Sequence, residues 1–342
     1  MTGLGKIGRM GANEEEFAMK IDAHLHLQSP TWFVPSDPVF PRPRKQNRRR
    51  QLPHHRPSLD RDSRDQAHLD YARRIGTASS IDEVAELLIG DMDAAGLDKA
   101  VLMAIDYDMN NRKVTLPHWK QLLELARIRD RYPGRFLLFC GMDLRRGKDG
   151  IPLFERAVKE LNCVGLKLVP HWGFYPNDKD LCYPYYEKCV EWNIPVASNC
   201  SAIGGSHIAA KYCHPLLWED VAYDFPELNI CLAHSGIPYH FEYALSLARS
   251  KHNVYMDLGD WESIDPCQIN LLFQLVRRAM NCAARYKIMF ASDWPVFRAL
   301  YDEKEWVELF SRDASKYGFE FTEEELNLLF SENAQDYLDM DL

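Results

Sequence analysis

The chain has 342 residues, of which 46% are hydrophobic and 27% are charged, and its formal net charge is −9. This composition is typical of a globular protein with a sizeable core, and the acidic balance argues against nucleic acid as a partner of the whole chain. No apolar run approaches the roughly 18 residues that a membrane span needs, so we expect no membrane partner. The nine cysteines form no C-x-x-C pair. They are typical of small buried side chains in a reducing compartment, which predicts a cytoplasmic protein.

Residues 1–19 carry several glycines and a short acidic run, and they lack the apolar stretch of a secretory leader. We predict a flexible N-terminal tail here and a single domain over residues 20–342.

Eight short apolar segments follow, and most are nearly continuous, as expected for strands that are covered on both faces of a parallel sheet. The predicted strands are residues 20–27, 99–106, 136–143, 164–170, 195–201, 229–236, 253–260 and 287–294. Helical periodicity occupies most of the intervals between them and the end of the chain. The predicted helices are residues 81–95, 116–132, 152–161, 183–192, 216–225, 240–250, 266–285, 303–317 and 323–338.

This repeated alternation of strand and helix predicts an α/β fold of the (β/α)8 type, that is, a TIM-type barrel. An open, doubly wound sheet is the alternative. A dinucleotide-binding version of that sheet loses support, because no G-x-G-x-x-G motif follows the first strand.

Residues 29–80 interrupt the pattern between the first strand and its helix. The segment is rich in proline and has a dense basic run between residues 42 and 56, which predicts an inserted loop rather than core. On a barrel this loop would leave the C-terminal face, where active sites lie, and could act as a lid over an anionic substrate. A solvated loop and a nucleic-acid contact are the alternatives.

The motif His24-Leu25-His26 lies near the end of the first predicted strand. Residues i and i+2 of a strand point to the same face, so both imidazoles face one point, as two ligands of a metal ion do. Three further polar residues interrupt apolar strands close to their C-terminal ends, namely Lys167, His234 and Asp293. Strand ends of a barrel converge on one pocket, and one shared cation offsets the cost of burying these groups separately.

Each of these residues also has a structural alternative. The paired histidines can be polar side chains at a strand end, Lys167 can pair with a carboxylate, His234 can be a core histidine and Asp293 can cap the next helix. Their shared position at strand ends favours one metal site over separate coincidences.

As a set, five motifs resemble the amidohydrolase-related branch of the amidohydrolase superfamily, which includes aminocarboxymuconate-semialdehyde decarboxylase and related aromatic-acid decarboxylases, lactonases and hydrolases. In chain order the motifs are Ile21-Asp22-Ala23-His24-Leu25-His26, Gly165-Leu166-Lys167, Leu232-Ala233-His234-Ser235-Gly236, Phe290-Ala291-Ser292-Asp293-Trp294-Pro295 and Ser331-Glu332-Asn333-Ala334-Gln335-Asp336-Tyr337-Leu338. The resemblance spans residues 20–338 and implies a TIM-type barrel with one divalent metal, usually zinc. It implies His24, His26 and Asp293 as ligands and His234 as a catalytic group beside the metal.

One position departs from the family. The family usually has a third metal-binding histidine at the end of strand 5, in a Pro-Val-x-x-His pattern, and here Asn199 stands in its place. An amide oxygen is a weaker ligand than an imidazole. Asn199 can therefore ligate weakly or through water, His207 can replace it from the loop beyond, or the site can be poor in metal.

Our first functional hypothesis is metal-dependent hydrolysis of a small carboxylated, cyclic or aromatic substrate by metal-activated water, with Asp293 and His234 as the catalytic groups. The predicted substrate-binding residues around the pocket are Lys167, His171, Trp172, His207, Trp294 and Arg298. The second hypothesis is non-oxidative decarboxylation of an aromatic or unsaturated acid by the same residues, and the third is a metal-poor binding protein. The expected cofactor is one divalent metal, zinc or alternatively manganese. The expected partner is a small anionic molecule, and the aromatic and proline-rich loops are compatible with a homodimer.

Overall fold

The computed structural model describes residues 19–34, 63–109, 114–201, 209–237, 239–263, 268–296, 298 and 300–340. Within them, eight parallel strands form one sheet in the order β1-β2-β3-β4-β5-β6-β7-β8, which confirms the predicted barrel. The strands are β1 Ile21–Leu25, β2 Lys99–Met103, β3 Phe136–Gly141, β4 Leu166–Leu168, β5 Val196–Asn199, β6 Ile230–Ala233, β7 Val254–Asp257 and β8 Ile288–Met289.

Backbone hydrogen bonds join the last strand region to the first. Ala23 N donates to Phe290 O at 3.0 Å, and Asp293 N donates to His24 O at 2.9 Å. His26 N then donates to Trp294 O at 2.8 Å. The segment that follows the two-residue strand β8 thus runs along β1 and closes the ring.

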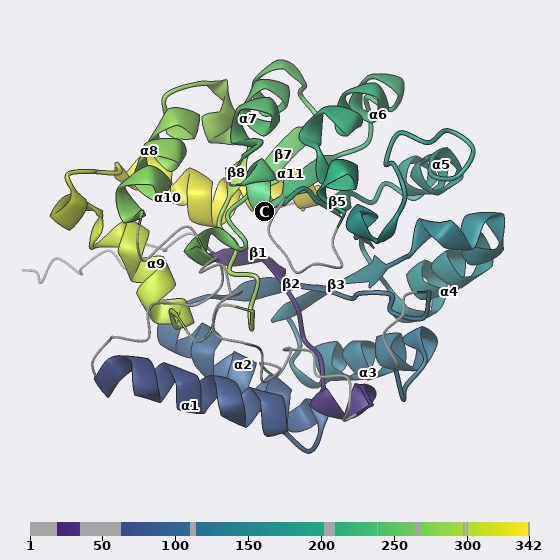
Figure 1. Ribbon diagram of the computed structural model, residues 1–342, viewed down its shortest axis with the longest axis horizontal. Helices are drawn as coiled ribbons and strands as arrows, with labels where there is room; N and C mark the ends of the chain where they lie inside the picture. The colour runs from purple at the N-terminus through teal and green to yellow at the C-terminus, as the bar shows by residue number, and fades with distance from the viewer. Residues whose placement is uncertain are drawn as a thin grey trace, which may run out of the picture.

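Helices surround the strands, and all but α11 lie outside the ring of strands (Figure 1). They are α1 Ser63–Thr77, α2 Ile81–Ala95, α3 His118–Arg131, α4 Ile151–Leu161, α5 Tyr183–Glu191, α6 Trp218–Asp224, α7 Phe241–Ser250, α8 Ile269–Met280, α9 Glu303–Ser311, α10 Glu323–Asn327 and α11 Asn333–Leu338. Helix α2 matches its predicted bounds, with Ser80 accepting the Glu83 amide as its N-cap and Gly96 in the left-handed region after its last residue. Within the described chain, no helix combines the length and apolarity needed to cross a membrane.

The prediction of loop structure throughout residues 29–80 is wrong for its last part, which forms helix α1. Its composition is polar, and the side chains it buries are few, with Ile75 and His68 among them. Such a narrow buried stripe leaves little apolar periodicity in the sequence, so the helix resembles a loop in composition. Residues 35–62 of the insertion and residues 1–18 of the predicted tail lie outside the described part of the chain.

The predicted last helix, residues 323–338, is interrupted. It begins with the expected capping box of Thr322 and Glu325, but Leu328–Glu332 adopts π-helical geometry between α10 and α11. Tyr337 and Ala334 of α11 pack against inward-facing strand residues such as Phe139 and Tyr255. Helix α11 therefore fills the barrel interior from the end opposite to the strand termini that carry the polar residues.

Candidate metal centre

An irregularity in β1 turns its two histidines toward the barrel interior. The register against β2 shifts between Asp22 and Leu25. Before the shift Ile21 packs in the interior cluster, whereas after it Leu25 packs with the outer layer. The alternation of faces is thereby reversed, and His24 and His26 take the inward positions at the end of the strand.

Hydrogen bonds at Nδ1 fix the orientation of both imidazoles. His26 Nδ1 lies 2.6 Å from the carbonyl oxygen of Met103, which can only accept a hydrogen bond, so His26 carries its proton at Nδ1. His24 Nδ1 lies 3.1 Å from Asp257 Oδ2 and donates to that carboxylate. Burial, followed by the charge of Lys167, lowers the pKa of His24 to about 3, so this ring is neutral. The Nε2 atom of His24 therefore presents a lone pair, and the Nε2 atom of His26 lies beside it.

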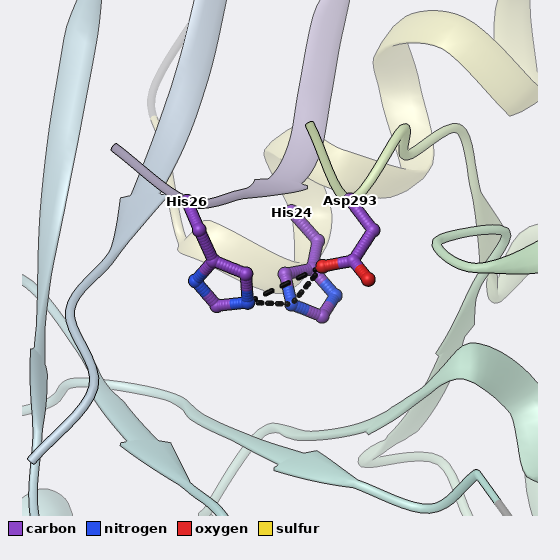
Figure 2. Close-up of side chains that lie close together, drawn as sticks. All are labelled: His24, His26 and Asp293. Carbon is purple, nitrogen blue, oxygen red and sulfur yellow. Dashed lines mark hydrogen bonds and ion pairs between the residues drawn. The ribbon is translucent and has the colours of Figure 1, made fainter. Parts of the chain in front are cut away.

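These two Nε2 atoms lie 3.2 Å apart and meet the carboxylate of Asp293 (Figure 2). Asp293 Oδ1 is 3.2 Å from His26 Nε2 and 3.6 Å from His24 Nε2. Burial raises the pKa of Asp293, but the hydrogen bond from His26 and the charges of the neighbouring histidines outweigh it and hold this pKa well below its usual range. Two imidazole nitrogens and a carboxylate oxygen directed at one point fit a divalent cation.

The backbone around this point is constrained. His234, Ser235, Asp260 and Asp293 all have φ between +52° and +69°, a conformation that residues other than glycine adopt at a cost. Each lies just beyond the C-terminal end of β6, β7 or β8. Clustered left-handed residues of this kind are typical of functional sites, where the surrounding structure maintains them.

Asp257, which sequence reasoning missed, connects the histidines. It ends β7 and is fully buried; one oxygen accepts from His24, and the other accepts from the amides of His234 at 2.7 Å and Gly259 at 3.1 Å. Burial raises the pKa of Asp257, yet the opposing charge and hydrogen bond of His24 lower it to about 2. Asp257 interrupts an apolar strand at its end, as Asp293 does in its own segment, so the same pattern could have identified it.

His234 lies next to His24, with ring centroids 4.9 Å apart. Its Nδ1 donates to the carbonyl oxygen of Gly259 at 2.9 Å, which leaves Nε2 as the basic atom. Asn199 Nδ2 donates to that Nε2 at 3.2 Å, while Asn199 Oδ1 accepts from the amide of Ser201. The described contacts of Asn199 are therefore with His234 and Ser201, and its role as a metal ligand stays a prediction.

Lys167 also reaches the centre. It is 2% exposed, and its Nζ donates to His24 Nε2 at 2.8 Å. Burial is the largest influence on this ammonium and lowers its pKa. Lys167 thus places its amino group beside the same His24 nitrogen that a metal ion would use.

The remaining predicted substrate-binding residues lie in two places. His171 and Trp172 follow β4, and the Trp172 ring lies 5.6 Å from that of Tyr107, beyond the end of β2. Trp294 and Arg298 are buried and both donate to Asp91 on α2. His207 lies outside the described residues, and the substrate-binding roles of all these side chains stay predictions.

A comparison with protein families identifies the family of this chain. The family model "Amidohydrolase" matches residues 21–339. The chain belongs to the amidohydrolase family. The resemblance inferred from the five motifs is therefore confirmed.

Known proteins match this chain at moderate to low identity. The 2-keto-4-carboxy-3-hexenedioate hydratase of Sphingobium sp. (strain NBRC 103272 / SYK-6) is 30% identical over 155 residues, which are 39% of this chain and 45% of that protein. The chain thus spans less than half the length of this curated relative.

Two solved structures share the barrel. A 5-carboxyvanillate decarboxylase from Novosphingobium aromaticivorans DSM 12444 with bound manganese matches with a TM-score of 0.60 and 14% identity over 95% of this chain and 98% of that one. A probable 2-pyrone-4,6-dicarboxylic acid hydrolase from Acinetobacter baumannii matches with a TM-score of 0.56 and 15% identity over 94% and 99%. At such identity these matches establish the fold alone.

Proposed function

We propose that this amidohydrolase is a metal-dependent hydrolase of a small carboxylated substrate, with His24, His26 and Asp293 as the metal ligands. The observation that carries the proposal is the approach of the two Nε2 atoms to 3.2 Å beside the Asp293 carboxylate. Two imidazole nitrogens and a carboxylate oxygen brought this close together match the ligand set of a divalent cation. Imidazole suits zinc, and the added carboxylate also accommodates manganese.

A divalent cation bound here would lower the pKa of a water molecule and polarise a substrate carbonyl. Side chains of the protein itself accept and donate the protons of the reaction. Asp293 is ionised because of the neighbouring histidines, so its carboxylate can accept a proton from the attacking water. His234, fixed by Gly259 at Nδ1, can take a proton at Nε2 and return it to the leaving group.

The proposed substrate carries a carboxylate, because the buried Lys167 side chain, when protonated, would donate a charge-assisted hydrogen bond to it. The names of the matching proteins agree with this chemistry, since a dicarboxylic acid hydrolase, a carboxyvanillate decarboxylase and a carboxyhexenedioate hydratase all refer to carboxylated compounds. A flat ring could lie against Trp172 and Tyr107, whose rings are tilted by 46° to each other.

The test is an assay of manganese- and zinc-loaded protein against a panel of lactones and hydroxybenzoates, with ring opening and CO2 release measured separately. We expect ring opening in the wild type and a loss of at least a hundredfold in kcat for Asp293→Asn. Wild-type activity in Asp293→Asn would exclude this residue assignment. Protein that contains no metal and gains none on addition of manganese or zinc would instead favour the metal-poor binding protein.

Non-oxidative decarboxylation is the second candidate, and Glu262 favours it. This carboxyl group is 3% exposed, and burial followed by the charges of Glu303 and Asp293 raises its pKa well above the usual range. A protonated acid near Asp293 could supply the proton that replaces CO2, as the carbon–carbon bond breaks and its electron pair remains on the substrate carbon. CO2 release without ring opening, lost in Glu262→Gln, would favour this reaction over hydrolysis.

A further inference from the structure

A buried carboxylate on α2 holds the segment that carries Asp293. Asp91 is 7% exposed and accepts three hydrogen bonds from this segment. Trp294 Nε1 donates to Asp91 Oδ2 at 3.0 Å, and Arg298 donates to the same oxygen from Nε at 2.9 Å and to Oδ1 from Nη2 at 3.1 Å. A bidentate pair with a further donor fixes both the position and the direction of the segment relative to α2.

Trp294 transmits this restraint to two of the proposed ligands. It directly follows Asp293, and its carbonyl oxygen accepts the amide of His26 at 2.8 Å. Its own amide donates to Ser292 Oγ at 3.1 Å, on the other side of Asp293. A shift of the Trp294 indole would therefore move the Asp293 carboxylate and the backbone of His26 together.

Helix α1, the described end of the insertion, covers the Asp91–Arg298 pair. The Tyr71 ring lies over the Arg298 guanidinium at 3.9 Å, and the Tyr71 hydroxyl donates to Leu87 O on α2. His68, one turn earlier on α1, donates from Nδ1 to Leu300 O at 3.2 Å and so also ties the helix to the segment after Arg298. Cover of this kind excludes water from the ion pair and so strengthens it.

We propose that Asp91 is a positioning residue of the metal centre, which sets the spacing of Asp293 and His26 through Trp294 and Arg298. The proposal rests on the metal site of the proposed function, but it assigns to Asp91 a role in metal affinity rather than in fold stability alone. Residues that orient metal ligands typically change affinity by 10- to 100-fold when mutated.

The test measures Mn²⁺ affinity of the full chain by calorimetry and the bound Mn²⁺ spectrum by electron paramagnetic resonance, together with the unfolding temperature of metal-free protein. We expect Asp91→Asn to weaken Mn²⁺ binding at least tenfold and to change the spectrum. Trp294→Phe, which keeps the Asp91–Arg298 pair and removes only the indole donor, should weaken binding severalfold. If Asp91→Asn fails to fold, the Mn²⁺ affinity of Trp294→Phe tests the proposal in its place.

Two controls separate positioning from stability. Glu325→Gln breaks the Arg277–Glu325 pair between α8 and α10, and Trp218→Phe shortens a fully buried indole on α6. Both should lower the unfolding temperature and leave Mn²⁺ affinity unchanged. The proposal is overturned if Asp91→Asn and Trp294→Phe bind Mn²⁺ like the wild type and only lose stability, as the controls do. If the wild type does not bind Mn²⁺, the metal site of the proposed function is itself wrong.

Discussion

His24 Nε2 and His26 Nε2 lie 3.2 Å apart beside the Asp293 carboxylate, while Nδ1 of His24 faces Asp257 and Nδ1 of His26 faces the Met103 carbonyl oxygen. This relationship predicts that a bound cation stabilises the folded protein. At a free Mn²⁺ or Zn²⁺ concentration of a hundred times Kd, the free energy of unfolding should rise by about 2.7 kcal/mol. The measurement is thermal unfolding with increasing metal and after chelation.

His24→Asn should abolish that metal-dependent gain. His252→Asn is the matched control, since His252 is exposed and contacts the carbonyl oxygen of Pro226 away from the centre. Equal metal-dependent stabilisation of the wild type and of His24→Asn would contradict the ligand assignment.

Asp257→Asn should weaken metal binding by about 10- to 100-fold while the barrel remains folded. An asparagine cannot accept from His24 on one atom and from the amides of His234 and Gly259 on the other, because one of these atoms becomes an amide nitrogen. Metal titration against Asp93→Asn, an exposed aspartate that pairs with Arg135, measures the difference. Unchanged affinity in Asp257→Asn would show that the orientation of His24 does not depend on this carboxylate.

Asp257 also predicts the acid sensitivity of the metal-free protein. Its pKa is lowered from an ordinary value of 3.8 to about 2 in the folded state. A depressed carboxyl pKa stabilises the folded protein above the unfolded value, and this contribution is lost as the pH falls from about 4 towards 2. Between these pH values, the measured free energy of unfolding should change less with pH for Asp257→Asn than for the wild type.

The sequence pattern predicted the barrel and the convergence of His24, His26 and Asp293, because strand periodicity and polar breaks at strand ends are local features. It also predicted that the two histidines share one face of the strand, but it did not explain why that face points into the barrel. The register shift within β1 is what turns that face inward, and a bulge depends on pairing with β2, which the sequence does not display.

Other parts of the centre depend on contacts between distant residues. Asp91 lies on a regular amphipathic helix, where an aspartate is usually solvated, and only the fold brings it to Trp294 and Arg298. Arg298 was predicted to bind substrate because its position near a strand end is visible in the sequence, whereas its buried partner 207 residues away is not.

Lys167→Met should separate substrate binding from metal binding. The Lys167 ammonium donates to His24 Nε2 and would repel a nearby cation, so its removal should leave metal affinity unchanged or increase it. Loss of a charge-assisted hydrogen bond to a substrate carboxylate should raise KM by about 10- to 100-fold. Lys304→Met, at an exposed position on α9, is the control. A loss of metal with unchanged KM would show that Lys167 supports the metal instead.

Glu262→Gln should stabilise the protein, and more so at higher pH. Glu262 Oε2 has no hydrogen-bond partner among the described residues, and burial raises the pKa of this carboxyl well above 4.5. The folded state then holds a proton that the unfolded state releases, so wild-type stability falls as the pH rises from 4.5 towards the folded pKa. Each unit of that interval costs about 1.4 kcal/mol, and a neutral glutamine avoids the cost.

Urea unfolding of wild type and Glu262→Gln between pH 4.5 and 8.5 measures this effect, with Glu227→Gln on the surface as the control. The difference in unfolding free energy should be small at pH 4.5 and grow steadily with pH. Only the folded wild type has to hold a proton on Glu262 that the unfolded chain releases. A difference that stays constant over this range would mean that Glu262 ionises alike in the folded and unfolded chains. A group that pairs with Glu262 in solution would then account for its ionisation, and Glu262 could not act as a protonated acid at neutral pH.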